Sequence, residues 1–124
     1  MANPQKAKGD NFERELAAYI NEYLGRELCS RAPLSGGGVV GILSGGADLI
    51  GPPDLFIEAK RVEKLSFPAA MAQAERNIIQ TQTQDMGVVI NRRNRMSTGQ
   101  SYVLLRLDDF LRLYKSHLTL EGIL

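Results

Sequence analysis

The sequence predicts an α/β domain in which helices flank a mixed central β-sheet. Stretches with the apolar spacing of a helix alternate with short runs rich in Val, Ile, Leu and Phe, and glycine or proline separates them. A length of 124 residues fits one domain with one hydrophobic core. We therefore expect a single domain over residues 1–124 with the element order α-β-β-β-α-β-β-α.

Residues 1–8 are polar and basic, and we expect a flexible N-terminus. A helix should follow, with Asp10 as its N-cap and Gly25 as its end, because apolar residues recur with helical spacing from Phe12 onward. Residues 27–33 predict a short strand that ends at Pro33. The glycines of residues 34–46 disfavour regular structure and predict a mobile loop, which in a small domain is functional or disordered.

A β-hairpin is predicted next, with strands in "ADLIG" and "DLFIEAKR" on either side of Pro52 and Pro53. A helix over residues 66–84 follows, with Ser66 near its cap and Pro68 in its first turn. The remaining elements are a strand, a turn, a strand and a short amphipathic helix, over residues 86–93, 94–99, 101–107 and 108–117.

The composition restricts the class of protein and the cellular compartment that we expect. Hydrophobic residues make up 44% and charged residues 23%, as in soluble globular proteins. The net charge is +1, so attraction to an anion must come from local clusters of charge. Cys29 is the single cysteine and cannot form an internal disulfide, which suits a reducing compartment. Without a long apolar run or a signal peptide, we expect a cytoplasmic protein that does not contact a membrane.

The hairpin carries charged residues where a sheet is expected to be apolar. Because side chains alternate along a strand, Glu58 and Lys60 should share one face with Phe56, and Asp48 can approach the same position from the preceding strand. Converging carboxylates repel each other unless a cation lies between them, and oxygen ligands favour Mg²⁺ or Mn²⁺. Glu13 falls within the apolar arc of the first helix, so one cation would explain all three acids.

Each of these residues also has an ordinary structural explanation. A Glu-x-Lys pair on a strand is common at solvent-facing positions, and an Asp beside a Gly-Pro turn often serves the turn itself. An acid on the flank of a helix is often half exposed. The functional interpretation depends on finding the three acids and Lys60 in order within one small α/β chain.

Five segments together resemble the PD-(D/E)XK nuclease superfamily, and within it the Holliday-junction resolvases of the archaeal type and their phage-encoded relatives. These segments are "KGDNFERELAAYI" (8–20), "SRAPLSGGG" (30–38), "GADLIG" (46–51), "FIEAKR" (56–61) and "AAMAQAERN" (69–77). The resemblance covers more than half of the chain and implies a restriction-endonuclease-like fold. It also implies hydrolysis of DNA phosphodiesters with Mg²⁺ or Mn²⁺, one or two ions per active site.

The resemblance assigns catalytic roles to Glu13, Asp48, Glu58 and Lys60, with the three acids as metal ligands. The literal "PD" pair includes Asp54, which is only four residues before Glu58 and would share its strand, so Asp48 is the better match. We also expect contacts with DNA from basic and polar positions in the matching segments or beside them, namely Lys8, Arg14, Arg31, Ser35, Arg61 and Gln73.

The implied substrate is branched DNA, the four-way junction, which a two-fold homodimer would cut by paired nicks. We expect the dimer interface to use "AAMAQA" and the late strands, and a phage-encoded member would act in the cytoplasm of a bacterial host. For "NRRNR" (91–95), an exposed charged turn and a phosphate-binding turn both remain open. The alternatives are another endonuclease of the superfamily, of the nicking, restriction-like or repair type, and a non-catalytic DNA-binding phage accessory protein.

Overall fold

Helices and strands alternate along the chain in the predicted order. The computed structural model describes residues 3–33 and 47–124, so the predicted loop over residues 34–46 lies outside the described residues. The elements are α1 (Pro4–Leu24), β1 (Ser30–Arg31), β2 (Leu49–Ile50), β3 (Leu55–Lys60), α3 (Phe67–Thr81), β4 (Met86–Asn91), η1 (Thr98–Gln100), β5 (Tyr102–Leu104) and α4 (Leu107–Leu120). The α/β class and a mixed sheet flanked by helices are thereby confirmed.

The described strands form one five-stranded sheet in the order β1-β2-β3-β4-β5. Neighbouring strands are antiparallel except β3 and β4, which are parallel and aligned from Leu55 opposite Met86 to Lys60 opposite Asn91. The connection between these two parallel strands contains α3, as a parallel crossover requires. Because β3 and β4 are parallel, the segments that follow Lys60 and Asn91 leave the sheet at the same end.

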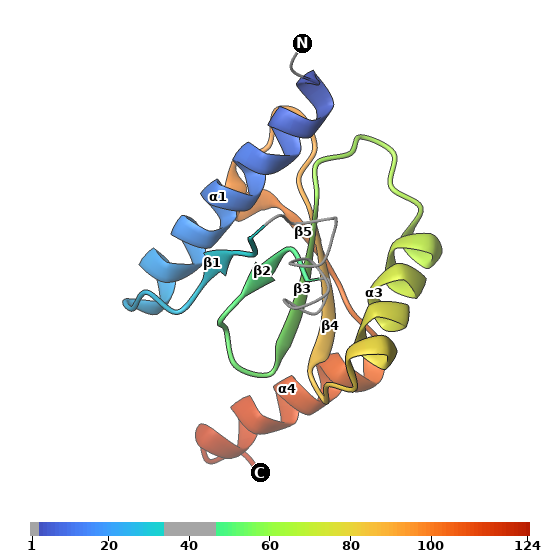
Figure 1. The fold of residues 1–124 in the computed structure, drawn as a ribbon. Coiled ribbons are helices and arrows are strands. Elements are labelled where there is room, and N and C mark those ends of the chain that lie inside the picture. The colour runs from blue at the N-terminus through green and yellow to red at the C-terminus, as the bar shows by residue number, and fades with distance from the viewer. Residues whose placement is uncertain (1–2, 34–46) are drawn as a thin grey trace.

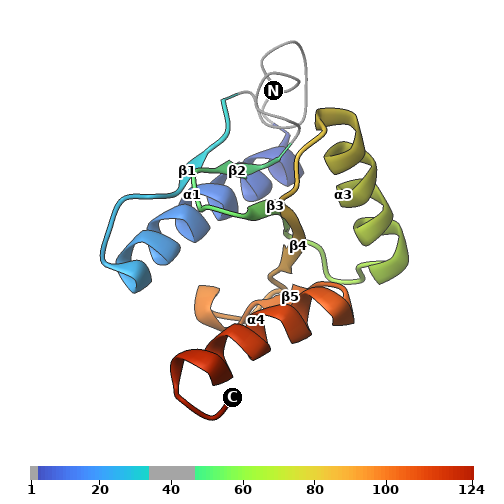
Figure 2. The same ribbon diagram turned by 90° about the horizontal axis from the view of Figure 1, so that it is seen from below.

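The sheet lies between α1 and α3, which cover its opposite faces (Figures 1 and 2). On the α1 face, Phe12 and Leu16 pack against Ile57 and Val88 in the larger of two apolar clusters. On the α3 face, a smaller cluster joins Ala70, Met71 and Ala74 to Val89. β3 therefore contributes alternate side chains to two different environments, as the period of a strand dictates.

The start of α1 differs from the prediction. The helix begins at Pro4, and the side chain of Asn3 accepts hydrogen bonds from two backbone N–H groups of the first turn. The assignment of Asp10 as the N-cap was therefore wrong, and residues 4–8 are helical. The first two turns carry only polar and small residues, so no apolar repeat indicated them. The predicted end at Gly25 is confirmed, with φ of 72° at that residue.

Ser66 caps α3 as predicted, because its Oγ accepts a hydrogen bond from the backbone N–H of Ala69 at 3.4 Å. The helix ends at Thr81, three residues before the predicted boundary at 84. The reason is Gln82, whose left-handed backbone with φ of 55° terminates the helix. Sequence periodicity carries little information about such a boundary, since the residues on both sides of it are polar.

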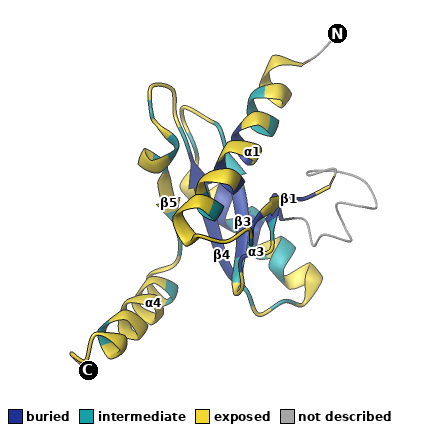
Figure 3. Cartoon of the chain, turned by 90° about the vertical axis from the view of Figure 1, so that its left-hand side faces the viewer, coloured by how far each residue is buried: buried dark blue, intermediate teal, exposed yellow. Residues whose placement is uncertain are grey.

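The C-terminal helix α4 packs least tightly against the rest of the molecule. It has no buried residue, and Figure 3 shows it exposed along its length. Its apolar side chains Phe110, Leu113 and Tyr114 remain about half exposed, as does Val103 of β5. We call these four residues the α4 surface. No helix in the described ranges is both long and apolar enough to cross a bilayer.

Candidate active site

The hairpin of β2 and β3 brings two carboxylates into contact. Leu49 is paired with Ile57, and the backbone N–H of Asp48 donates to the Ile57 carbonyl at 2.9 Å. The Asp48 Oδ2 atom accepts from the backbone N–H of Ala59 at 2.7 Å. This register places Asp48 opposite Glu58 on the neighbouring strand, and the two carboxyl groups are hydrogen-bonded to each other. Both are buried, with exposed fractions of 9% and 2%.

This contact changes the protonation of Glu58. Burial, followed by repulsion from Asp48, raises the pKa of Glu58 from 4.5 to about 8. The hydrogen bond from Asn77 and the positive charge of Lys60 act in the opposite direction but are weaker causes. Near neutral pH the carboxyl group of Glu58 therefore keeps a proton unless a cation compensates the charge of the pair.

Two amides of α3 hold the functional side chains of β3. The Asn77 Nδ2 atom donates to Glu58 Oε1 at 3.1 Å, and Lys60 Nζ donates to Gln73 Oε1 at 2.9 Å. Glu58 and Lys60 thus share the α3 face, as strand alternation predicts. Gln73 was a predicted site residue, but Asn77 was missed. Its sequence position gave a signal, because it lies three residues after the inward-facing Ala74.

The third predicted acid belongs to a different part of the structure. Glu13 is buried on α1, the helix that covers the opposite face of the sheet, and its Oε2 atom accepts from Arg31 Nε at 2.6 Å. Arg31 also pairs with Asp10 at 2.7 Å. Among residues 3–33 and 47–124, no three His, Cys, Asp or Glu side chains are grouped to hold a metal ion. The described residues therefore do not show the expected convergence of three acids.

The donor atoms near Asp48 and Glu58 fit a hard divalent cation. The N–H and C=O groups of a strand residue lie along the same edge, and the Ala59 N–H reaches Asp48, so the Ala59 carbonyl lies on that edge too. The Ile57 carbonyl instead accepts a hydrogen bond within the hairpin. Two carboxylates and one carbonyl form an all-oxygen donor set, which suits Mg²⁺ or Mn²⁺.

The other predicted DNA-binding residues lie at different places on the surface. Lys8 Nζ donates to Asn94 in the loop after β4 at 2.9 Å, and Arg61 contacts the backbone of the same loop at 3.2 Å. Among residues 3–33 and 47–124, Arg14 donates a hydrogen bond only to Asn11 of its own helix. Ser35 lies outside the described residues. Lys8 and Arg61 therefore share one end of the sheet, near the end of β3.

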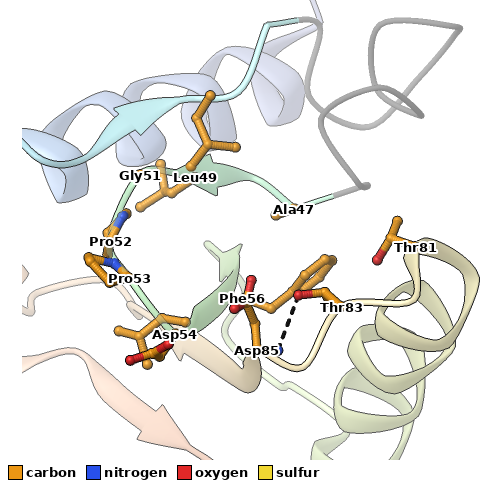
Figure 4. Close-up of a pocket in the computed structure, with 12 residues that line it drawn as sticks. Ala47, Leu49, Gly51, Pro52, Pro53, Asp54, Phe56, Thr81, Thr83 and Asp85 are labelled. Carbon is orange, nitrogen blue, oxygen red and sulfur yellow. Dashed lines mark hydrogen bonds between the residues drawn. The ribbon is translucent and has the colours of Figure 1, made fainter.

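A hollow of about 410 Å³ lies beside the turn of the hairpin, between that turn and the end of α3 (Figure 4). Asp54 lines this hollow, but neither Asp48 nor Glu58 does. Asp54 is exposed and has a φ of 68°, which identifies it as a turn residue at the far end of the hairpin from Lys60. The literal "PD" pair is thus separate from the carboxylate contact, and the hollow is not the candidate site.

A comparison with family models, with curated proteins and with solved structures found no significant match for this chain. The contacts of the described side chains are therefore what indicates a function. Of these, the buried contact between Asp48 and Glu58 is the least expected for a purely structural hairpin, since the charge of Asp48 raises the cost of ionising Glu58.

Proposed function

We propose that the chain is a metal-dependent endodeoxyribonuclease that resolves four-way DNA junctions by phosphodiester hydrolysis. The observation that carries the proposal is the buried, hydrogen-bonded pair of Asp48 and Glu58, with Lys60 on the same face of β3. Such a pair is costly to ionise fully unless a cation neutralises it, which favours a metal site over a structural role. The resemblance of the hairpin and first helix to PD-(D/E)XK nucleases supports the choice of reaction.

Each side chain has a role that follows from its contacts. Asp48, Glu58 and the Ala59 carbonyl would hold a divalent ion. When bound, the ion would polarise the scissile phosphate and make a water molecule more acidic. Lys60, which Gln73 holds at 2.9 Å, supplies a positive charge for a phosphate oxygen or for the attacking water. Asn77 fixes one oxygen of Glu58 and so orients the carboxylate.

The position of Glu13 favours one ion over two. Its carboxylate pairs with Arg31, whose guanidinium also binds Asp10. Arg31 thus gives Glu13 a cationic partner in place of a second metal. In the proposed enzyme, Glu13 is a positioning residue that holds Arg31, and Arg31 is the group that contacts a DNA phosphate.

The test is cleavage of a labelled immobile four-way junction, with and without Mg²⁺. Wild-type protein should cut only with the metal, and Asp48→Asn or Lys60→Ala should lower the rate by about 10²-fold or more. Asp54→Asn is the matched control, because it removes an exposed acid from the far end of the same hairpin and Asn tolerates a positive φ. Equal rates for wild type and Asp48→Asn would refute the proposal.

The proposed preference for four-way junctions over other DNA structures needs a separate test. Rates on the junction should exceed those on flaps and on linear duplex of the same sequence. Equal rates on all three substrates would instead assign the chain to nicking, restriction-like or repair endonucleases with the same active site.

The proposed reaction also needs two copies of the chain, because productive resolution takes two nicks and the junction is two-fold symmetric. Ala70, Met71 and Ala74 are buried against their own sheet, so within "AAMAQA" only Ala69, Ala72 and Gln73 are accessible to a partner. The α4 surface is the better candidate, because it is apolar and exposed. Light scattering at micromolar concentration should give the mass of a dimer, and a monomer would contradict this part.

The cytoplasm is the proposed location. Cys29 is a buried free thiol, and burial raises its pKa to about 11, so it stays protonated and unreactive. This agrees with a structural role for Cys29 in the core beside α1.

A further inference from the structure

We infer that the loops after β3 and β4 form a second phosphate-binding surface, which holds the DNA backbone next to the acidic pair. We call this surface the basic rim; it consists of Lys8, Arg61, Lys64, Arg93 and Arg95. The inference rests on the proposed function and extends it to side chains outside the hairpin. Four observations carry it: topology, loop structure, charge and backbone conformation.

The topology places the basic rim beside Lys60. Because β3 and β4 are parallel and Lys60 is opposite Asn91, both loops leave the same end of the sheet. The backbone N–H of Arg92 donates to the Lys60 carbonyl at 3.0 Å. Figure 1 shows the two loops at the upper end of the sheet, near the first turns of α1, and Lys8 of α1 contacts Asn94 there. A DNA strand that reaches Lys60 would meet this end of the molecule.

Side-chain contacts join the two loops into one unit. The carboxylate of Glu63 accepts from the backbone N–H of Asn94 and from Arg93 Nε. The Asn91 Oδ1 atom accepts from the backbone N–H of Val62 at 3.3 Å. Arg61 adds a bond to the Arg92 carbonyl at 3.2 Å. These contacts argue against two independent solvent-exposed turns, which would not need to be joined.

The charge of the basic rim is largely uncompensated. Within the described residues, the side chains of Lys64 and Arg95 form no ion pair and no hydrogen bond, while Lys8 and Arg61 contact only neutral acceptors. The whole chain has a net charge of only +1, so this excess is local. Of the five cations only Arg93 is ion-paired, with Glu63 at 3.5 Å, within the described residues. Exposed cations of this kind can contact phosphates, which gives affinity without base recognition.

The conformation of Arg95 is the most specific of the observations. Its φ is 66°, within a tight turn in which the N–H of Met96 donates to the Arg93 carbonyl at 3.4 Å. Glycine or asparagine is favoured at such a position, and a long side chain is strained there. No contact within the described residues compensates this strain, and the side chain of Arg95 is exposed. The turn therefore fixes the backbone of Arg95 while its charged side chain faces solvent, where a phosphate can reach it.

The substitution Arg95→Gly separates the two explanations of this turn. Glycine relieves the strain, so the melting temperature should stay unchanged or rise. Affinity for a fluorescent four-way junction should fall about 3- to 10-fold at 100 mM salt, as expected for a lost phosphate contact. The slope of log K against log salt should decrease by about one. Anisotropy in EDTA gives this readout without cleavage. Lys64→Gln should lower the affinity and the salt slope in the same way. The control is Arg26→Gln, which removes an exposed arginine just after the far end of α1.

The outcomes distinguish this inference from the proposed function. If Arg95→Gly and Lys64→Gln bind the junction with wild-type affinity and salt slope, the basic rim is refuted, whether or not the wild type cuts DNA. The same holds if Arg26→Gln weakens binding equally. If the rim variants lose affinity while wild-type protein does not cleave with Mg²⁺, the basic rim stands as a DNA-binding surface and the catalytic proposal fails.

Discussion

The two faces of β3 have different tasks although they belong to the same six-residue strand. Toward α1, Leu55, Ile57 and Ala59 pack in the apolar cluster that also contains Phe12 and Leu16. Toward α3, Glu58 and Lys60 contact the amides of Asn77 and Gln73. Strand alternation therefore separates the residues that stabilise the fold from those that bind ions and phosphate, so one set can change without the other.

The largest expected effect comes from the apolar face. Replacing the fully buried Ile57 by alanine should lower the free energy of unfolding by about 2–5 kcal/mol, through lost apolar contacts and the cavity left between β3 and α1. Urea denaturation measures this directly. The matched change on the other face, Glu58→Gln, should cost far less or even stabilise the protein without metal. If Glu58→Gln proves as damaging as Ile57→Ala, the separation of the two faces is refuted.

The polar face should make stability depend on pH. Since the folded chain raises the pKa of Glu58 from 4.5 to about 8, the folded state keeps a proton that the unfolded state has lost between these values. The contribution is complete below pH 4.5 and is lost as pH rises to about 8. The free energy of unfolding of the metal-free protein should fall by up to about 1.4 kcal/mol per pH unit from this group.

Denaturation from pH 4.5 to 8.5 in EDTA, compared between wild type and Glu58→Gln, isolates this slope. The variant has no titrating group at position 58, so the stability of the wild type should fall steadily relative to that of the variant as pH rises. Curves that run parallel over the whole range would mean that Glu58 is ionised in the folded protein at all these values, and that Asp48 does not affect its charge.

The smallest effect is expected from the α3 amides. Gln73→Ala removes the acceptor of Lys60 but no apolar contact, so stability should change by less than about 1 kcal/mol. The rate of junction cleavage should fall about tenfold, because the ammonium loses its fixed position. Gln73→Glu keeps an acceptor at the same site and should retain more of the rate. An unchanged rate in Gln73→Ala would exclude a positioning role for this residue.

Much of the fold could be predicted because the local patterns were strong. The alternation of "LFIEAK" identified which side chains of β3 share a face, and glycine and proline identified the turns. The start of α1 could not be predicted from periodicity, since Pro4 to Lys8 are polar or small. The start is instead defined by the side chain of Asn3 and by Pro4 at the first helical position. Residues 34–46 lie outside the described part of the chain, so the prediction of a loop there remains a prediction.

The candidate site was predictable only where its residues are close in sequence. The proximity of Asp48 to Glu58 follows from the hairpin register, which the turn at Pro52 already suggested. The partner of Glu13 did not follow, because Arg31 is eighteen residues away and reaches it only through the docking of α1 on β1. An acid on the inner side of a helix signals that it has a partner, but not whether that partner is a metal or an arginine.

One consequence concerns α3, which contacts the core through Ala70, Met71 and Ala74 and the polar face through Gln73 and Asn77. A single rod supplies both amides, so the ammonium of Lys60 and the carboxylate of Glu58 cannot be repositioned independently. Any tilt or slide of α3 would shift both groups together, and the buried Ala70 and Ala74, which pack with Val89, hold this helix against the sheet.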